Sequence, residues 1–203
     1  MHHHIPSEVP VRYLPRDKTM NMVVGALFAI GLLSFVVRLT QDAQSAWISY
    51  ITNWLFFTSI SMGGVMFGVA TWMVKAKWNW PMRRVSQSFV AFLPISFVLL
   101  LPMLGLGDSY FPWIDMMAPD PIVAKKAAYL NMPFLVARNL VGVTVLFGLA
   151  LHFVYLAVRP DMGLVRDSAE EDEQRRSWRD KLTQGWRGQE QEEVASYRRM
   201  TTL

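Results

Sequence analysis

The stretch WISYITNWLFFTSISMGGVMFGVATWMVKAKWNWPMRR, residues 47–84, decides the fold of this chain. From residue 47 to residue 74 it carries no charged side chain. About 20 apolar residues are enough for a helix to cross the hydrocarbon core of a bilayer, so the stretch predicts a membrane-spanning helix. The basic residues that follow it directly are Lys75, Lys77, Arg83 and Arg84. A basic cluster at the end of an apolar segment marks the cytoplasmic side of the membrane.

Three further apolar blocks accompany this one. Of the 203 residues 52% are hydrophobic, and they gather in blocks, which is typical of an integral membrane protein. The predicted spans cover residues 20–39, 47–74, 85–106 and 132–158. We therefore predict an all-α integral membrane fold, namely a four-helix transmembrane bundle.

The charges beside these spans predict the orientation of the chain. The N-terminal arm at residues 1–19, the loop at residues 75–84 and the segment at residues 159–203 are basic next to the spans, whereas the other two loops are not. Four spans with both the N and C ends in the cytoplasm satisfy this bias throughout. The same flanks account for the net charge of +4, so we expect no nucleic-acid partner.

Several kinds of chemistry are excluded by residues that the sequence lacks. There is no cysteine, which rules out a thiolate-bound iron–sulfur cluster and a cysteine nucleophile. His152 is the one histidine in the predicted spans, whereas a bis-histidine haem needs two. The phosphate-binding, dinucleotide-binding and zinc-protease motifs are also absent. We therefore expect no catalytic residue, no metal site and no cofactor bound by this chain.

Glycines in the second predicted span indicate a close helix contact. Gly64 and Gly68 form a G-x-x-x-G pair, and Gly63 precedes them. Because glycine has no side chain, two helix backbones can approach closely at such positions. The pair fits a dimer or packing inside the same bundle, and we favour packing inside the bundle.

Polar residues inside apolar spans are costly and are therefore candidates for function. The predicted spans contain Asn53, Arg138, Asn139 and His152, and Asp115 lies in the outer loop. On one helix, Arg138 and His152 would lie within about 40° of each other and about 21 Å apart along the axis. One interpretation has Arg138 reach the interface or bind Asp115, with His152 bound to a backbone carbonyl. The other places these residues in a proton path or a quinone head-group site, with Asp115 at its outer mouth.

Two prolines and the C-terminal segment complete the prediction. Pro94 and Pro102 lie inside the third span, where each removes an amide donor and is expected to kink the helix. The kink either serves packing or opens a carbonyl toward a pocket, and packing is favoured. Residues 159–203 lose the apolar character and predict a solvated, partly helical segment.

Three groups of residues together support a family resemblance. They are Gly63-Gly64 with Trp78-x-x-Pro81-x-Arg83-Arg84; Leu93-Pro94 and Leu101-Pro102 with Tyr110-Phe111-Pro112-Trp113; and Lys126-Ala127-Ala128-Tyr129-Leu130-Asn131-x-Pro133-Phe134 followed by Arg138. This pattern, over residues 47–152, resembles the second NrfD-like membrane subunit (quinone-binding subunit 2 type) of alternative complex III. That complex is a bacterial quinol:electron-acceptor oxidoreductase.

The resemblance implies a role in electron transport. It implies a multi-pass subunit of the bacterial inner membrane that holds no redox cofactor and is not itself the redox-catalytic subunit. Its expected partners are a homologous quinol-binding membrane subunit, a multihaem cytochrome c subunit and an iron–sulfur subunit, so that quinol, haem c and the clusters belong to neighbouring chains. The family also implies support of the quinol-binding subunit and a part in proton translocation.

The chain departs from that family in length. Family members usually carry about twice as many spans, arranged in two bundles, so we expect residues 159–203 to lead to a second bundle that is missing here. Two alternatives stay open. The chain could be a purely structural membrane scaffold, or it could anchor a different NrfD-type enzyme, such as a polysulfide or thiosulfate reductase with a molybdenum subunit.

Overall fold

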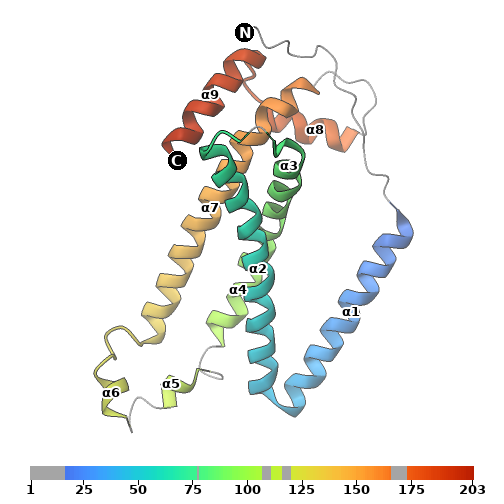
Figure 1. The fold of residues 1–203 in the computed structure, drawn as a ribbon. Helices are drawn as coiled ribbons and strands as arrows, with labels where there is room; N and C mark the ends of the chain where they lie inside the picture. Colours follow the sequence, from blue (N-terminus) through green and yellow to red (C-terminus); the bar gives the residue numbers. More distant parts are fainter. Residues whose placement is uncertain (1–16, 77, 107–110, 116–119, 166–172) are drawn as a thin grey trace. The chain divides into compact units, whose positions relative to one another are not determined.

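The computed structural model describes residues 17–76, 78–106, 111–115, 120–165 and 173–203, and Figure 1 shows their helices. The predicted arm at residues 1–19 falls almost wholly outside these ranges, as does part of the predicted outer loop. The helices are α1 Lys18–Gln41, α2 Ala43–Met73, α3 Trp80–Ser88, the 3-10 helix η1 Phe89–Phe92, α4 Leu93–Gly105, α5 Pro112–Asp115, α6 Pro121–Ala124, α7 Met132–Leu164, α8 Glu173–Leu182 and α9 Gln189–Thr202. Within the described ranges there is no β-strand.

Four helical segments are long and apolar enough to cross a membrane. They are Lys18–Gln41, Ala43–Met73, Met82–Gly105 and Met132–Leu164. The prediction of an all-helical chain with four such segments is therefore confirmed. The third segment is not one uniform helix, because α3, η1 and α4 follow one another within it.

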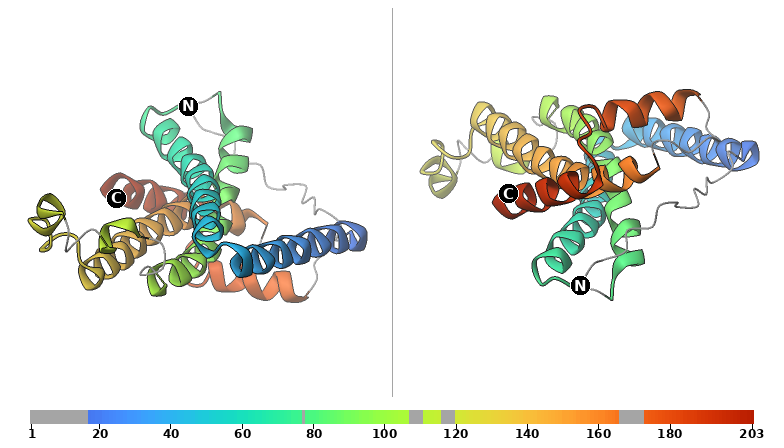
Figure 2. Two further views of the ribbon diagram at one scale, coloured as in Figure 1. Left: turned by 90° about the horizontal axis from the view of Figure 1, so that it is seen from below. Right: turned by 90° about the horizontal axis from the view of Figure 1, so that it is seen from above.

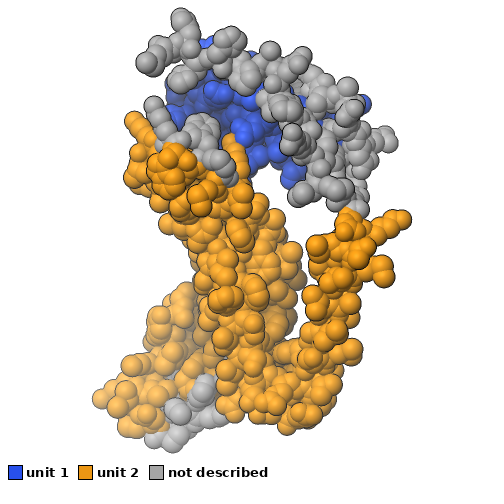
Figure 3. Space-filling view, turned by 45° about the vertical axis from the view of Figure 1, so that its right-hand side comes forward, with its two compact units in different colours: residues 1–15, 151–203 blue, residues 16–150 orange. Residues whose placement is uncertain are grey.

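The described backbone forms two compact units, coloured separately in Figure 3. The bundle unit comprises residues 16–150, and the tail unit comprises residues 1–15 and 151–203. Helix α7 contributes its first part to the bundle unit and its last part to the tail unit.

Helices α1 and α2 are joined by Asp42 alone, where the sequence predicts a longer turn. The Asp42 amide donates to the Arg38 carbonyl, and the Asp42 carboxylate accepts from the amide of Ser45 at 3.0 Å. Asp42 thus ends α1 and caps the N-terminus of α2, which begins at Ala43. From this joint the two helices diverge, as Figures 1 and 2 show.

Helix α1 presents its apolar side chains outward around its whole circumference. None of its residues is buried, and Met22 and Phe28 are 75% and 72% exposed. Its contact with α2 is concentrated near the joint, where the Phe35 ring packs against the rings of Trp47 and Tyr50 at centroid distances of 5.8 and 5.4 Å. A helix that is apolar all round is typical of a membrane span.

The core of the bundle unit joins α2, α4 and the start of α7. Its buried members are Trp47, Leu100, Met103, Leu104 and Leu135. In helices that span a membrane, such a cluster stabilises the bundle by van der Waals packing of its side chains. Further aromatic and aliphatic side chains pack around this cluster, from α1 through α5 to α7.

Two glycines bring α2 against the α3–η1 segment. A Cβ atom on Gly64 would lie 2.7 Å from the carbonyl oxygen of Ser86, and one on Gly68 would lie 3.3 Å from the Gln87 side chain. No other atom lies within 4 Å of the corresponding position on Gly63. The G-x-x-x-G pair therefore packs inside this chain, whereas Gly63 faces open space.

Pro94 coincides with a change of helix type. Residues Phe89–Phe92 form the 3-10 helix η1, and the Leu93 amide donates to the Val90 carbonyl three residues before it. In an α-helix the amide of residue 94 would donate to that carbonyl, but proline has no N–H. The tighter 3-10 turn supplies a donor in its place.

Candidate functional site

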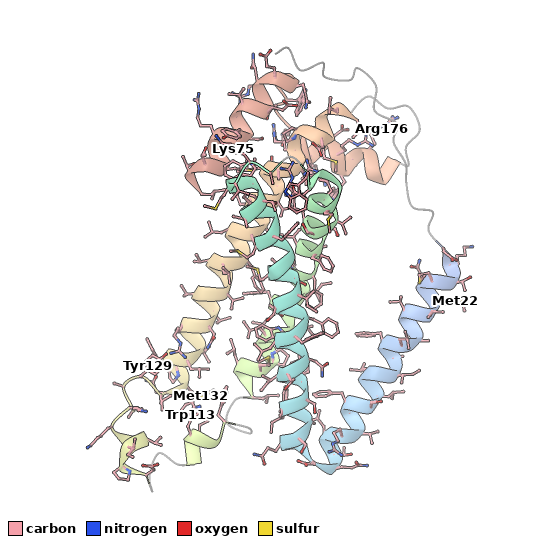
Figure 4. All side chains as sticks on the ribbon, in the orientation of Figure 1. Met22, Lys75, Trp113, Tyr129, Met132 and Arg176 are labelled. Carbon is pink, nitrogen blue, oxygen red and sulfur yellow. The ribbon has the colours of Figure 1, made fainter. Side chains whose placement is uncertain are left out.

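Arg138 is positioned by a turn that precedes α7. The Asn131 side-chain amide donates to the carbonyls of Ala127 and Ala128, at 3.1 and 2.9 Å. Its side-chain oxygen accepts from the amide of Phe134 at 2.9 Å, so Asn131 caps the helix. These bonds hold residues 127–130 against the first turn of α7. Figure 4 labels Tyr129 and Met132 at this end of the bundle unit.

The Arg138 guanidinium lies on two aromatic rings of this turn. Its central carbon is 4.5 Å from the centroid of the Tyr129 ring and 5.6 Å from that of Phe134. The two rings also contact each other, with centroids 5.8 Å apart. Cations are attracted to the faces of aromatic rings by about 0.5–1 kcal/mol at exposed sites. The two rings contact the guanidinium, and Arg138 as a whole is exposed.

Asn139 and Asn53 bond to their own helices. The Asn139 side-chain amide donates to the Leu135 carbonyl one turn earlier at 2.8 Å. The Asn53 side-chain amide donates in the same way to the Ser49 carbonyl at 2.8 Å. Asn53 is exposed in this chain and Asn139 is half-buried. Each of these bonds satisfies one side-chain donor locally and connects no second helix.

His152 lies in the part of α7 that belongs to the tail unit. Its imidazole stacks on the Tyr155 ring, with centroids 6.3 Å apart and planes inclined by 27°. The predicted bond from His152 to a backbone carbonyl does not occur among the described hydrogen bonds, and the side chain is exposed. The stacking orients the imidazole along the surface of its own helix.

The predicted residues of the bundle unit do not contact one another. Within the described part of that unit, no hydrogen bond or ring contact joins any two of Asn53, Arg138 and Asn139. Asp115 ends α5, and its side chain lies outside what the structure describes. The proton path through these residues stays a prediction.

A polar seam between α2 and α4 escaped the sequence analysis. The Tyr50 hydroxyl donates to the Leu99 carbonyl at 2.7 Å, and the Trp54 indole donates to the Ser96 carbonyl at 2.8 Å. The Thr58 and Ser96 hydroxyls are 2.6 Å apart. Residues 50, 54 and 58 are four positions apart and therefore lie on one face of α2. This spacing of polar side chains is the feature of the sequence that could have predicted the contact. The seam fastens α2 to the segment that carries Pro94 and Pro102, which favours the packing interpretation of these prolines.

The tail unit contains a second polar cluster that the sequence analysis missed. The Arg159 guanidinium donates to Glu192 at 2.8 Å, to the Tyr155 hydroxyl at 2.7 Å, and to the carbonyls of Leu182 and Gln184 at 2.9 and 3.0 Å. Glu192 is 3% exposed. Arg159 directly follows the fourth predicted span, and it joins α7, the end of α8 and α9.

Tight packing beside Arg159 completes this cluster. A Cβ atom on Gly163 would lie 1.9 Å from the Trp186 ring, so only glycine leaves room for the indole there. Arg179, Thr183, Glu192 and Ser196 are all buried. The described part of the segment predicted to be solvated and partly helical contains α8 and α9, and it buries several of its polar side chains.

Glu192 makes the fold of the tail sensitive to acid. Its hydrogen bond from Arg159, followed by the charges of Arg159 and Arg187, lowers its pKa from the ordinary 4.5. A lowered folded-state pKa stabilises the fold fully above pH 4.5, and this contribution is lost as the pH falls through the lowered value. We expect α9 to detach as the pH falls through this lowered pKa of Glu192.

This detachment can be followed by 19F NMR of protein that carries 5-fluorotryptophan, with Trp186→Phe identifying the Trp186 signal. Glu192→Gln provides the control, because glutamine has no carboxyl group to titrate. It also cannot form the ion pair with Arg159, so its Trp186 signal should already be shifted at neutral pH. A Trp186 signal that titrates equally in both proteins would contradict the assignment to Glu192.

Comparisons with known proteins assign no family. No protein-family model matches the chain, and no curated protein is significantly similar to it.

Proposed function

We propose that this chain is a multi-pass subunit of the bacterial inner membrane, with its N and C ends in the cytoplasm. The observation that carries the proposal is the presence of four helices long and apolar enough to span a bilayer. The apolar surface of α1, which is exposed except near the joint with α2, supports it, because lipid or a neighbouring subunit can cover that surface. The basic residues at 75–84 support the orientation.

Within the membrane, we propose a supporting role in an alternative complex III-like quinol:electron-acceptor oxidoreductase. This proposal rests on the three residue groups over residues 47–152. Their members have defined packing roles in this chain. Gly64 admits Ser86 against α2, Asn131 caps α7, and Tyr129 holds Arg138. The redox chemistry would then belong to the partners: the quinol-binding subunit, the multihaem cytochrome c subunit and the iron–sulfur subunit.

The described contacts favour support over proton conduction. Asn53 and Asn139 each bond to a carbonyl of their own helix, and His152 stacks within its own helix. A proton path needs donors and acceptors that pass from one group to the next. The seam formed by Tyr50, Trp54, Thr58 and Ser96 instead locks two helices together.

The proposal is tested by purification of the complex from native membranes. Extraction in a mild detergent, mass spectrometry and haem staining of the co-purified chains identify the partners. We expect a multihaem cytochrome c and a second, homologous membrane subunit. A molybdenum subunit without multihaem cytochrome c would favour the polysulfide or thiosulfate reductase anchor. If the chain purifies alone, or with partners that carry no redox group, the result would favour the structural scaffold.

His152→Phe tests whether His152 carries protons. Phenylalanine keeps an aromatic ring to stack on Tyr155 but has no nitrogen to exchange a proton. We expect the complex to assemble and to oxidise quinol at the wild-type rate, with an unchanged number of protons released per electron. Measurement in proteoliposomes with a pH-sensitive dye provides this ratio. A lower ratio at unchanged quinol oxidation would place His152 in a proton path.

A further inference from the structure

Arg138 is a fixed cation whose hydrogen-bonding groups have no acceptor among the described residues. Its guanidinium contacts Tyr129 and Phe134 through the ring faces. No hydrogen bond or ion pair to Arg138 occurs anywhere in the described ranges. A guanidinium has five N–H donors, and those not turned toward a ring are free to bind an anion.

The position of Arg138 in its helix places its guanidinium near the head-group layer of a bilayer. Arg138 lies six residues after Met132, the first residue of α7, and therefore about 9 Å along the helix axis. A charge within a span is costly unless it is paired or reaches the interface. Side chains on a helix tilt toward its N-terminus, and the contacts with Phe134 and Tyr129 draw the guanidinium the same way. It therefore points toward the head-group layer at this end of α7.

The surroundings of Arg138 are basic and aromatic. Lys125 and Lys126 are exposed in the preceding turn, and the amides of Tyr129 and Leu130 donate to the Lys126 carbonyl at 2.9 and 2.7 Å. The Asp120 carboxylate is engaged as the cap of α6, where it accepts from the Ile122 amide at 2.8 Å. Lys125 and Lys126 thus precede the exposed Tyr129, whose ring contacts Arg138, by four and three residues.

Arg38 provides a contrast in the same unit. It lies in the last turn of α1, one turn before Asp42, at the end where Phe35 and Leu39 pack against the cluster that includes Leu135 of α7. The pKa of the Asp42 carboxyl is lowered by its hydrogen bonds from Ser45 and, to a smaller extent, by the charge of Arg38. Arg38 therefore has a carboxylate of its own chain nearby.

We propose that Arg138, whose guanidinium contacts the Tyr129 and Phe134 rings and which follows the exposed Lys125 and Lys126 in the chain, binds the phosphate of an anionic phospholipid head group. The planar guanidinium offers two parallel N–H groups that match phosphate oxygens. The ring faces orient that fork, and the two lysines favour a lipid with net negative charge over a zwitterionic one. This inference rests on the proposed insertion of the chain into a membrane, and not on its membership of a redox complex.

The site is tested by native mass spectrometry of the full chain in detergent, titrated with short-chain phosphatidylglycerol or phosphatidylcholine. We expect tighter binding of phosphatidylglycerol, and Arg138→Gln should weaken that binding about tenfold, because a hydrogen bond to a charged group is lost. Tyr129→Leu should weaken it about threefold through loss of the ring contact. Arg138→Lys, which keeps the charge but not the fork, should fall between wild type and Arg138→Gln.

Arg38→Gln is the matched control and should leave phosphatidylglycerol binding unchanged. The proposal is overturned if Arg138→Gln binds this lipid as wild type does, if Arg38→Gln weakens binding equally, or if both lipids bind equally well. Displacement of the lipid by millimolar inorganic phosphate would show a site for free phosphate instead. If Asp115→Asn binds phosphatidylglycerol more tightly than wild type does, the Asp115 carboxylate is the anion paired with the Arg138 guanidinium, and the proposal is overturned. The purification of partners answers separately whether the chain belongs to a redox complex.

Discussion

Arg159→Gln should release α8 and α9 from the end of α7. Arg159 makes four hydrogen bonds, and its partner Glu192 has a side chain that is only 4% exposed. Removing one partner of a buried ion pair leaves the other charged without compensation, which costs about 3 kcal/mol. The carbonyls of Leu182 and Gln184 lose their donor in the same step. We therefore expect this substitution to have the largest effect on the fold of the tail.

The effect is measured by hydrogen exchange of the α9 amides. A loss of about 3 kcal/mol in the free energy of local opening accelerates exchange by about 100-fold. Arg187→Gln is the matched control, because Arg187 also contacts Glu192 but at 3.4 Å and with a side chain that is 56% exposed. We expect it to change exchange by less than about fivefold. If the α9 amides exchange at the same rate in Arg159→Gln and in Arg187→Gln, Arg159 does not hold α9 against α7.

Gly64→Ala should destabilise the bundle unit, whereas Gly63→Ala should not. The added methyl group on Gly64 would meet the Ser86 carbonyl at 2.7 Å and the Phe89 side chain at 3.1 Å. The carbonyl belongs to the backbone of α3, so relief requires a shift of that helix. Overpacking of this kind costs about 1–3 kcal/mol. On Gly63 the same methyl group meets no atom within 4 Å, and the higher helix propensity of alanine favours the helix.

The two glycine variants differ by one position and share the same chemistry. Thermal unfolding followed by circular dichroism in one detergent compares them directly. We expect a lower midpoint for Gly64→Ala and an equal or higher midpoint for Gly63→Ala, relative to wild type. Two variants with the same midpoint would mean that α2 and α3 do not meet closely at Gly64.

Hydropathy predicted the four apolar helices because a span depends on composition over a long window, without reference to any partner. The joint at Asp42 was harder to predict from hydropathy, since apolar character fades over residues 41–46 and suggests a turn. The capping bond to Ser45 allows α2 to begin within that stretch. The feature of the sequence that indicates this helix start is local: Asp42 lies three positions before Ser45 and can cap the helix. A hydropathy average over many residues does not detect such a cap.

The tail and the candidate site depend on long-range pairing, which a single sequence does not reveal. Arg159 and Glu192 are separated by 33 residues, and neither differs in type from the exposed charges around it. The polar residues in the spans stand out in the sequence, because a polar side chain in an apolar helix is costly. Their partners were not predictable, because an asparagine such as Asn139 can satisfy one donor on its own helix as readily as on another.

Asp42 also has a mechanical consequence. As the one residue between α1 and α2, with φ of −154° and ψ of 91°, it leaves the two helices no slack. A force that pulls α1 away along its axis is passed at once to the first turn of α2, where the Ser45 amide is held. The joint can bend at two dihedral angles but cannot lengthen, so α1 can swing about it while its end stays tethered to the core.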